Sequence, residues 1–177
     1  LCEKAQIPFG QTMLGLSAAP TGHPLNMGML GMHGNLAPNV MTNQCDLLIA
    51  VGMRFDDRVT GDLHTYAKQA KVIHFEIDPS EVGKIVKPTV AVLGNCKQTL
   101  AQVTELVEPA RHQAWIDGFK PYAEKEYNKV IDAALNPKDG PLLMGEVVRR
   151  VSEAARTGKL DPVIGRDREI ETVIGIL

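Results

Sequence analysis

The chain has 177 residues, of which 44% are hydrophobic and 23% are charged. This composition is that of a globular protein and excludes wholesale disorder, and the length suits one domain together with part of another. The 19 basic and 21 acidic residues leave a formal net charge of −2, so we expect no nucleic-acid partner. The longest apolar run, residues 47–53, is far shorter than the roughly 20 residues that span a bilayer, so we expect no membrane partner.

The first residues of the chain and its cysteines bear on the cellular compartment of the protein. The chain opens on Leu1 rather than Met, so we expect the natural N-terminus to lie upstream, and no signal or transit peptide is recognisable. The three cysteines, Cys2, Cys45 and Cys96, are odd in number and lack C-x-x-C spacing. Such a pattern argues against a disulfide scaffold or a zinc site and predicts reduced thiols in a cytoplasmic protein.

Three short apolar runs predict buried strands in the first two thirds of the chain. They cover residues 47–51, 72–77 and 89–93, and each ends at a glycine or at Asp78-Pro79. Helical patterns alternate with them over residues 35–43, 63–69 and 96–107. Strands that alternate with helices are typical of a parallel, doubly wound sheet, so the predicted fold class is α/β with a Rossmann-like sheet and flanking helices.

Beyond residue 108 the pattern changes to helices without strands. Residues 110–135 carry aromatic residues among many charges, which predicts a surface helix or a helical linker. Residues 136–141 form a turn-rich boundary, and residues 142–155 are again amphipathic and helical.

The carboxyl ends of the predicted strands are candidate binding positions, because ligands bind at that edge of an open parallel sheet. Gly52 would let a ligand approach the backbone, and Arg54 and Arg58 could offer guanidinium forks to a phosphate. Glu76 stands where such folds often hold a ribose, and Asn95 follows the third strand. No G-x-G-x-x-G motif follows the first strand, so these residues fit either an arginine-held dinucleotide or a plain turn with surface arginines.

Other polar segments carry weaker signals. His33 is flanked by glycines before a predicted helix, which fits either a ligand-wrapping loop or a solvated turn. We expect Asp56 or Asp57 to cap a helix or contact the loop rather than form a carboxylate pair. No histidine has a partner at metal-ligand spacing, and no P-loop, G-x-S-x-G or H-E-x-x-H motif is present. We therefore predict no metal site and no self-contained catalytic centre.

Six collinear segments resemble the central domain of the acetolactate synthase (acetohydroxyacid synthase) large-subunit family. The resemblance extends in order over residues 1–108. The segments are 7–9 (IPF), 12–16 (TMLGL), 23–25 (HPL), 28–34 (GMLGMHG), 46–61 (DLLIAVGMRFDDRVTG) and 74–83 (HFEIDPSEVG).

The resemblance implies a parent enzyme that condenses two pyruvates to 2-acetolactate, or pyruvate and 2-oxobutyrate to 2-aceto-2-hydroxybutyrate, in branched-chain amino-acid synthesis. That family uses thiamine diphosphate, Mg²⁺ and FAD, and its central domain holds the FAD without net redox chemistry in the main reaction. Its substrates are 2-oxo acids, and its large subunit forms homo-oligomers, often with a regulatory small subunit.

The resemblance also implies which residues of this chain would contact FAD. Those next to the flavin would be Thr12, Leu14, Leu30, Gly31, Met32 and His33. Those at the ribityl-diphosphate region would be Gly52, Arg54, Asp56, Arg58 and Val59. At the adenosine end, Glu76 and Ile77 would make contact, with Asn95 nearby, although the family usually has Asp at the positions of Glu76 and Asn95.

These similarities imply four segments. Residues 1–108 would be an N-terminally truncated FAD-binding central domain, 109–141 a helical linker, and 142–155 the start of the thiamine-diphosphate domain. Residues 156–177 resemble the entry to the first ATPase domain of Clp-type AAA+ chaperones, which predicts a chimeric junction. The family's catalytic glutamate and its Mg²⁺ motif have no counterpart here, so we expect the isolated chain to be inactive.

Two alternative functions follow from the same residues. The tail favours a non-catalytic nucleotide-binding or AAA+ chaperone-related module, although it covers far fewer residues than the synthase resemblance. A related thiamine-dependent enzyme that binds ADP, or nothing, in its central domain is a further alternative, against which the G-M-H-G and R-F-D-D-R segments argue.

Overall fold

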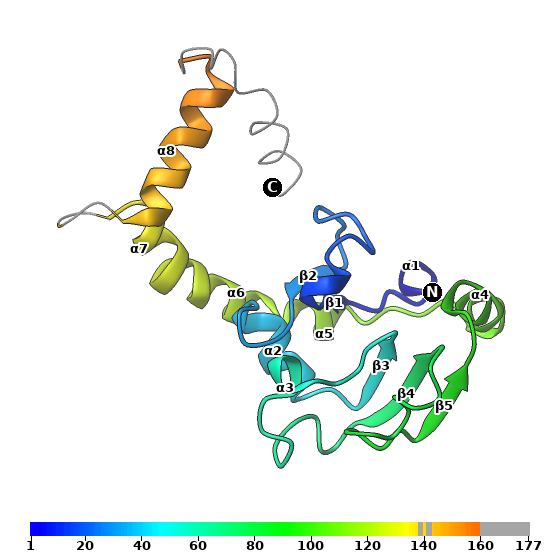
Figure 1. The fold of residues 1–177 in the computed structure, drawn as a ribbon. Coiled ribbons are helices and arrows are strands. Elements are labelled where there is room, and N and C mark those ends of the chain that lie inside the picture. The colour runs from blue at the N-terminus through cyan, green and yellow to red at the C-terminus, as the bar shows by residue number, and fades with distance from the viewer. Residues whose placement is uncertain (138–139, 141–142, 160–177) are drawn as a thin grey trace, which may run out of the picture. The chain divides into compact units, whose positions relative to one another are not determined.

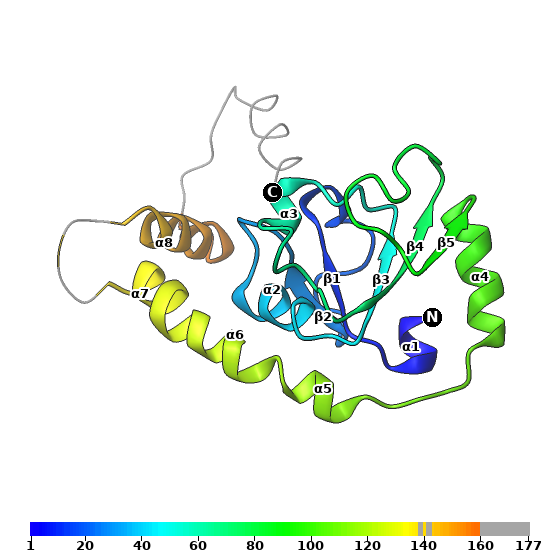
Figure 2. The ribbon, with the colours of Figure 1, turned by 90° about the horizontal axis from the view of Figure 1, so that it is seen from below.

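A computed structural model describes residues 1–137, 140 and 143–159 of the chain (Figures 1 and 2). The chain divides into two compact units, Leu1–Tyr127 and Asn128–Leu177. The division falls inside the stretch 109–141 that the sequence predicts as a linker. The Clp-like tail predicted for residues 156–177 lies, from residue 160 on, outside the described residues.

A parallel three-stranded sheet forms the larger part of the first unit. It contains β3 (Leu47–Val51), β4 (Lys71–Glu76) and β5 (Val90–Leu93), paired in the order β3-β4-β5 (Figure 1). All three are strands that the sequence predicts, shifted by no more than one residue at either end. The predicted α/β class with a parallel sheet is therefore confirmed.

A second parallel pair of strands precedes this sheet in the chain. It joins β1 (Phe9–Gln11) to β2 (Asn26–Met29), with an irregular register between Phe9 and Gln11. Neither strand is predicted from the sequence. Each is only three or four residues long and contains a glycine, so neither carries an alternating or continuous apolar pattern.

Four helices accompany the strands of the first unit as far as residue 106. They are α1 (Cys2–Ala5), α2 (Leu36–Thr42), α3 (Asp57–Thr60) and α4 (Cys96–Leu106). The predicted helices 35–43 and 96–107 correspond to α2 and α4, of which α4 packs on β4.

The prediction of a helix over residues 63–69 is wrong. The segment forms successive turns, and Ala67 has a φ of 42°, in the left-handed region that ends a right-handed helix. The Ala67 N–H donates to the side-chain oxygen of Asn43 at 2.9 Å instead of to a carbonyl one turn earlier. A contact with a residue distant in the sequence thus overrides the local helical pattern.

Two further helices of the first unit, α5 (Gln113–Asp117) and α6 (Lys120–Glu126), lie in the stretch predicted as a surface helix or linker. Helix α6 packs on α2. Their shared core consists of buried Ala37, Met41 and Phe119. Residues 113–126 therefore supply part of the apolar core of the first unit.

A short π-helix, Tyr127–Ile131, begins at the last residue of the first unit. The second unit also contains α7 (Asp132–Leu135) and α8 (Met144–Arg156). Helices α7 and α8 pack together, and the Arg149 side chain donates to the Leu135 carbonyl at 3.0 Å. Helix α8 corresponds to the amphipathic helix predicted for residues 142–155. Among the described residues, no helix is long and apolar enough to cross a membrane.

Tyr66 is a buried tyrosine in the core beneath β3 and β4. Its cluster includes Ala50, Phe55, Ala67 and Val72. Its hydroxyl has no hydrogen-bond partner among the described residues. The pKa of Tyr66 is raised to about 12, mainly because burial disfavours the charged phenolate and to a smaller extent because Cys45 lies nearby.

Changing Tyr66 to Phe is expected to reduce the loss of stability at high pH. The unfolded tyrosine ionises near pH 10, so the folded chain, with its raised pKa, loses stability as the pH rises from about 10 to 12. Between pH 9 and pH 11, urea denaturation should show the wild type losing about 1.4 kcal/mol more than Tyr66→Phe. A Tyr127→Phe control, at an exposed position, should follow the wild type. Parallel curves for the wild type and Tyr66→Phe would contradict this expectation.

Candidate functional site

The segment after β3 turns sharply at the carboxyl edge of the sheet. Gly52 and Phe55 both have positive φ angles, 59° and 58°, and Phe55 is fully buried. The Phe55 ring meets the His74 ring edge-on at 5.1 Å between centroids and that of Tyr66 at 6.4 Å. This packing offsets the cost of the left-handed backbone and fixes the position of the residues that follow.

Asp56 organises the two arginines of this segment. Its carboxylate accepts from the Arg58 N–H at 3.1 Å, which caps α3, and lies 3.7 Å from the Arg54 guanidinium. The expectation that one of the two neighbouring aspartates forms a cap is confirmed. The Arg54 side chain is 63% exposed, and Arg58 forms no ion pair with any residue that the structure describes. Both guanidinium groups are thus accessible to an anion.

Residues 28–34 approach this segment backbone to backbone at Gly31. Gly31 has a φ of 103°, and a Cβ atom there would lie 2.8 Å from the Arg58 carbonyl oxygen. The next N–H, that of Met32, donates to the same oxygen at 2.8 Å. Only glycine leaves room for this hydrogen bond between two loops that are distant in the sequence.

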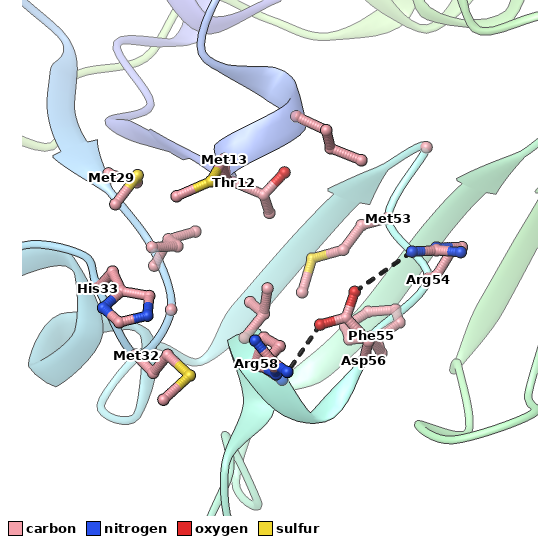
Figure 3. A pocket seen from close by; sticks show the side chains of 15 residues that line it. Thr12, Met13, Met29, Met32, His33, Met53, Arg54, Phe55, Asp56 and Arg58 are labelled. Carbon is pink, nitrogen blue, oxygen red and sulfur yellow. Dashed lines mark hydrogen bonds and ion pairs between the residues drawn. The ribbon is translucent and has the colours of Figure 1, made fainter.

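The same loop closes on itself at Gly34. A Cβ atom at Gly34 would collide with the Met29 carbonyl oxygen, which accepts a hydrogen bond from the Asn35 N–H at 2.8 Å. This tight turn leaves Met32 and His33 exposed beside the cavity described below (Figure 3).

A 3-10 turn, Met13–Gly15, forms the third side of the site. The Gln11 side chain donates to the Gly15 carbonyl at 2.8 Å, and the Gln11 carbonyl accepts from the Leu30 N–H at 2.8 Å. Gln11 therefore joins the turn to the loop 28–34. Leu14, at the tip of the turn, is 90% exposed.

These three segments line a cavity of about 270 Å³ that is open to solvent on one side (Figure 3). Eleven of the fourteen residues that the family resemblance implies as cofactor contacts line it. They are Thr12, Leu14, Leu30, Gly31, Met32, His33, Gly52, Arg54, Asp56, Arg58 and Val59. The structure thus brings together residues that lie in three separate parts of the sequence.

Four further residues line the cavity without having been predicted: Met13, Met29, Met53 and Phe55. All four are neighbours of predicted contacts in the sequence. Their position next to predicted contacts could have indicated them, because a loop that wraps a ligand presents consecutive residues to it. Three of the four are methionines, whose flexible thioethers adapt to flat or irregular apolar surfaces.

Glu76, Ile77 and Asn95 lie outside this cavity. The Glu76 carboxylate is buried, accepts from the N–H groups of Ile77 and Asp78 at 2.8 and 3.2 Å, and lies 3.7 Å from the His74 ring nitrogen. Ile77 is 68% exposed, and the Asn95 side chain caps α4 by accepting from the backbone N–H two residues on. Glu76 ends β4, Ile77 follows it and Asn95 comes after β5, but the contact of these residues with a cofactor stays a prediction.

The described residues contain no group of three or more histidine, cysteine, aspartate or glutamate side chains that could hold a metal ion. The chemistry of this site is instead that of two accessible guanidinium groups, tightly packed glycine backbone and an apolar, methionine-rich lining. Such a lining suits a flat organic ligand that also carries negative charge.

The fold and the site together define a class of protein. This is an α/β domain with a parallel sheet whose candidate ligand cavity lies at the carboxyl ends of its strands, as is general in such sheets.

Comparison with known families makes the assignment specific. Residues 1–103 match the family described as thiamine pyrophosphate enzyme, central domain. The chain belongs to this family.

Similar proteins include several acetolactate synthase large subunits. The chain is 41% identical over 160 residues to that of Parasynechococcus marenigrum, which covers 88% of this chain and 25% of the relative. It is 44% identical over 115 residues to the acetolactate synthase isozyme 1 large subunit of Escherichia coli, covering 65% of this chain and 20% of the relative. This chain therefore spans at most a quarter of the length of these two relatives.

Gly31→Ala is expected to destabilise the first unit, because the new methyl group would push the Arg58 carbonyl away at a position with positive φ. We expect a loss of about 2 kcal/mol or more in the free energy of unfolding, measured by urea denaturation. Gly22→Ala is the matched control, since nothing lies within 4 Å of a Cβ atom there, and should change stability by less than about 0.5 kcal/mol. Equal effects of the two substitutions would show that the contact at Gly31 is not tight.

Proposed function

We propose that this chain is the FAD-binding central part of an acetolactate synthase large subunit. The observation that carries the proposal is the convergence of eleven predicted cofactor contacts, from three separate loops, on one cavity. Membership of the thiamine pyrophosphate enzyme family and similarity to acetolactate synthase large subunits support it independently.

The residues of the cavity fit the chemistry of FAD. The exposed guanidinium groups of Arg54 and Arg58 match the two negative charges of a diphosphate. Methionine side chains and the packed backbone at Gly31 suit the flat, largely apolar flavin ring. The cavity volume of about 270 Å³ suits only part of so large a cofactor, and its adenosine end would extend along the strand ends towards Ile77.

In the complete enzyme, thiamine diphosphate with Mg²⁺ would supply the chemistry that joins two 2-oxo acids, pyruvate with pyruvate or with 2-oxobutyrate. The role of this chain would be to bind and orient FAD, using the arginines for the diphosphate and the loop 28–34 for the ring. The parent protein would be a cytoplasmic homo-oligomer that associates with a regulatory small subunit. We expect the chain by itself to form no 2-acetolactate.

Titration of the purified chain with FAD tests the proposal. We expect saturable binding, seen as a change in the flavin absorption spectrum and a rise in melting temperature, because a ligand that binds the folded state stabilises it. Arg54→Ala should weaken binding by about tenfold, as loss of one charge-assisted hydrogen bond would predict.

Two controls make the titration specific. Arg111→Ala removes an exposed arginine outside the cavity and should leave the dissociation constant for FAD unchanged. ADP carries an adenosine and a diphosphate, as FAD does, but lacks the flavin ring, and it should bind more weakly than FAD. Binding of ADP without any response to FAD would instead favour a nucleotide-binding module or a related enzyme that holds ADP in its central domain.

A further inference from the structure

Glu126 lies at the end of α6, within the stretch that the sequence predicts as a linker and beyond the residues 1–103 that match the family model. Its carboxylate oxygen Oε2 accepts a hydrogen bond from the backbone N–H of Leu36 at 3.0 Å. The same oxygen accepts from the side-chain amide of Asn35 at 3.4 Å. Since Leu36 is the first residue of α2, Glu126 caps this helix from another element.

Asn35 and Asn39 extend this network into the loop 28–34, which lines the cavity proposed to bind the flavin. The Asn35 side-chain oxygen accepts from the Met29 N–H at 2.9 Å. The Asn39 side chain accepts from the Gly31 N–H at 3.0 Å and donates to the Gly31 carbonyl at 2.9 Å and the Asn35 carbonyl at 3.0 Å. Side-chain hydrogen bonds therefore hold both Met29 and Gly31 from the side of α2.

The docking of α6 on α2 has an apolar basis that does not involve Glu126. Ala37, Met41 and Phe119 are buried together between the helices, and Trp115 packs against them. Glu126 also forms no ion pair with any side chain among the described residues, although Arg and Lys residues are the usual partners of a glutamate. The contacts that account for this carboxylate are those with Asn35 and the Leu36 N–H.

We propose that Glu126 is a positioning residue of the flavin site. It fixes the start of α2 and the Asn35 side chain, and through them the backbone of the loop 28–34. The inference rests on the proposed function for its ligand, and it extends the functional site to a helix outside the matched domain. Loss of the carboxylate should loosen the loop and weaken FAD binding without unfolding the sheet.

The test combines FAD titration with amide hydrogen exchange of the full chain, in which exchange is measured without FAD. Glu126→Ala should raise the dissociation constant for FAD by about tenfold, the effect of one charge-assisted hydrogen bond. It should also speed the exchange of the Gly31 and Leu36 amides, while that of the His74 amide in β4 stays unchanged.

Two further variants separate positioning from general destabilisation. Glu126→Gln keeps an acceptor oxygen for the Leu36 N–H and should restore most of the exchange protection and most of the affinity. Glu124→Ala makes the same substitution at an exposed position on the same helix and should match the wild type in amide hydrogen exchange and in FAD affinity.

The outcomes distinguish this inference from the proposed function. Unchanged exchange at Gly31 and Leu36 in Glu126→Ala, equal acceleration at His74, or faster loop exchange with an unchanged FAD affinity would each overturn the positioning role. If the wild type binds no FAD, the proposed function fails, and the exchange pattern still decides whether Glu126 orders the loop.

Discussion

A direct backbone contact between two loops determines the shape of the candidate site. The Met32 N–H donates to the Arg58 carbonyl at 2.8 Å, and Gly31 leaves no space for a side chain at the contact. One loop follows β2 and the other follows β3, two strands that belong to different sheets. Because this hydrogen bond joins the loops, the apolar part of the cavity and its arginines lie beside one another.

Aromatic packing and side-chain hydrogen bonds also fix each of the two loops in position. Beneath the β3 loop, Phe55 packs edge-on against His74, whose fully buried ring lies 3.7 Å from the Glu76 carboxylate. Behind the other loop, Asn39 bonds both backbone groups of Gly31, and Glu126 caps the helix that carries Asn39. Rigid support of this kind places binding groups before a ligand arrives, which lowers the cost of ordering them on binding.

Much of the fold could be predicted from local sequence, because the strands of the main sheet are apolar runs that end at breaker residues. The segment 63–69 could not, since the hydrogen bond from the Ala67 N–H to Asn43 joins residues from different parts of the chain. The short strands β1 and β2 carry no periodic pattern and depend on their pairing with each other.

The candidate site, like the fold, could be predicted only in part from local sequence. The rule that ligands bind at strand ends makes Gly52 and Arg54 candidate contacts, but their sequence also fits a plain turn with surface arginines. The loop around His33 likewise fits either a ligand site or a solvated turn, and only the family resemblance favours the ligand site at both places. The role of Glu126 depends on a contact 90 residues away in the sequence, with Leu36. No local pattern reports such a contact.

Glycine amide resonances would show whether FAD binds where the three loops meet. In a two-dimensional NMR titration of the labelled chain with FAD, we expect the amide signals of Gly31 and Gly52, which line the cavity, to shift together with one dissociation constant. Those of Gly118 and Gly145, which lie outside the cavity, should stay in place. Saturable shifts confined to Gly118 or Gly145, or no shift at saturating FAD, would mean that FAD does not bind where the three loops meet.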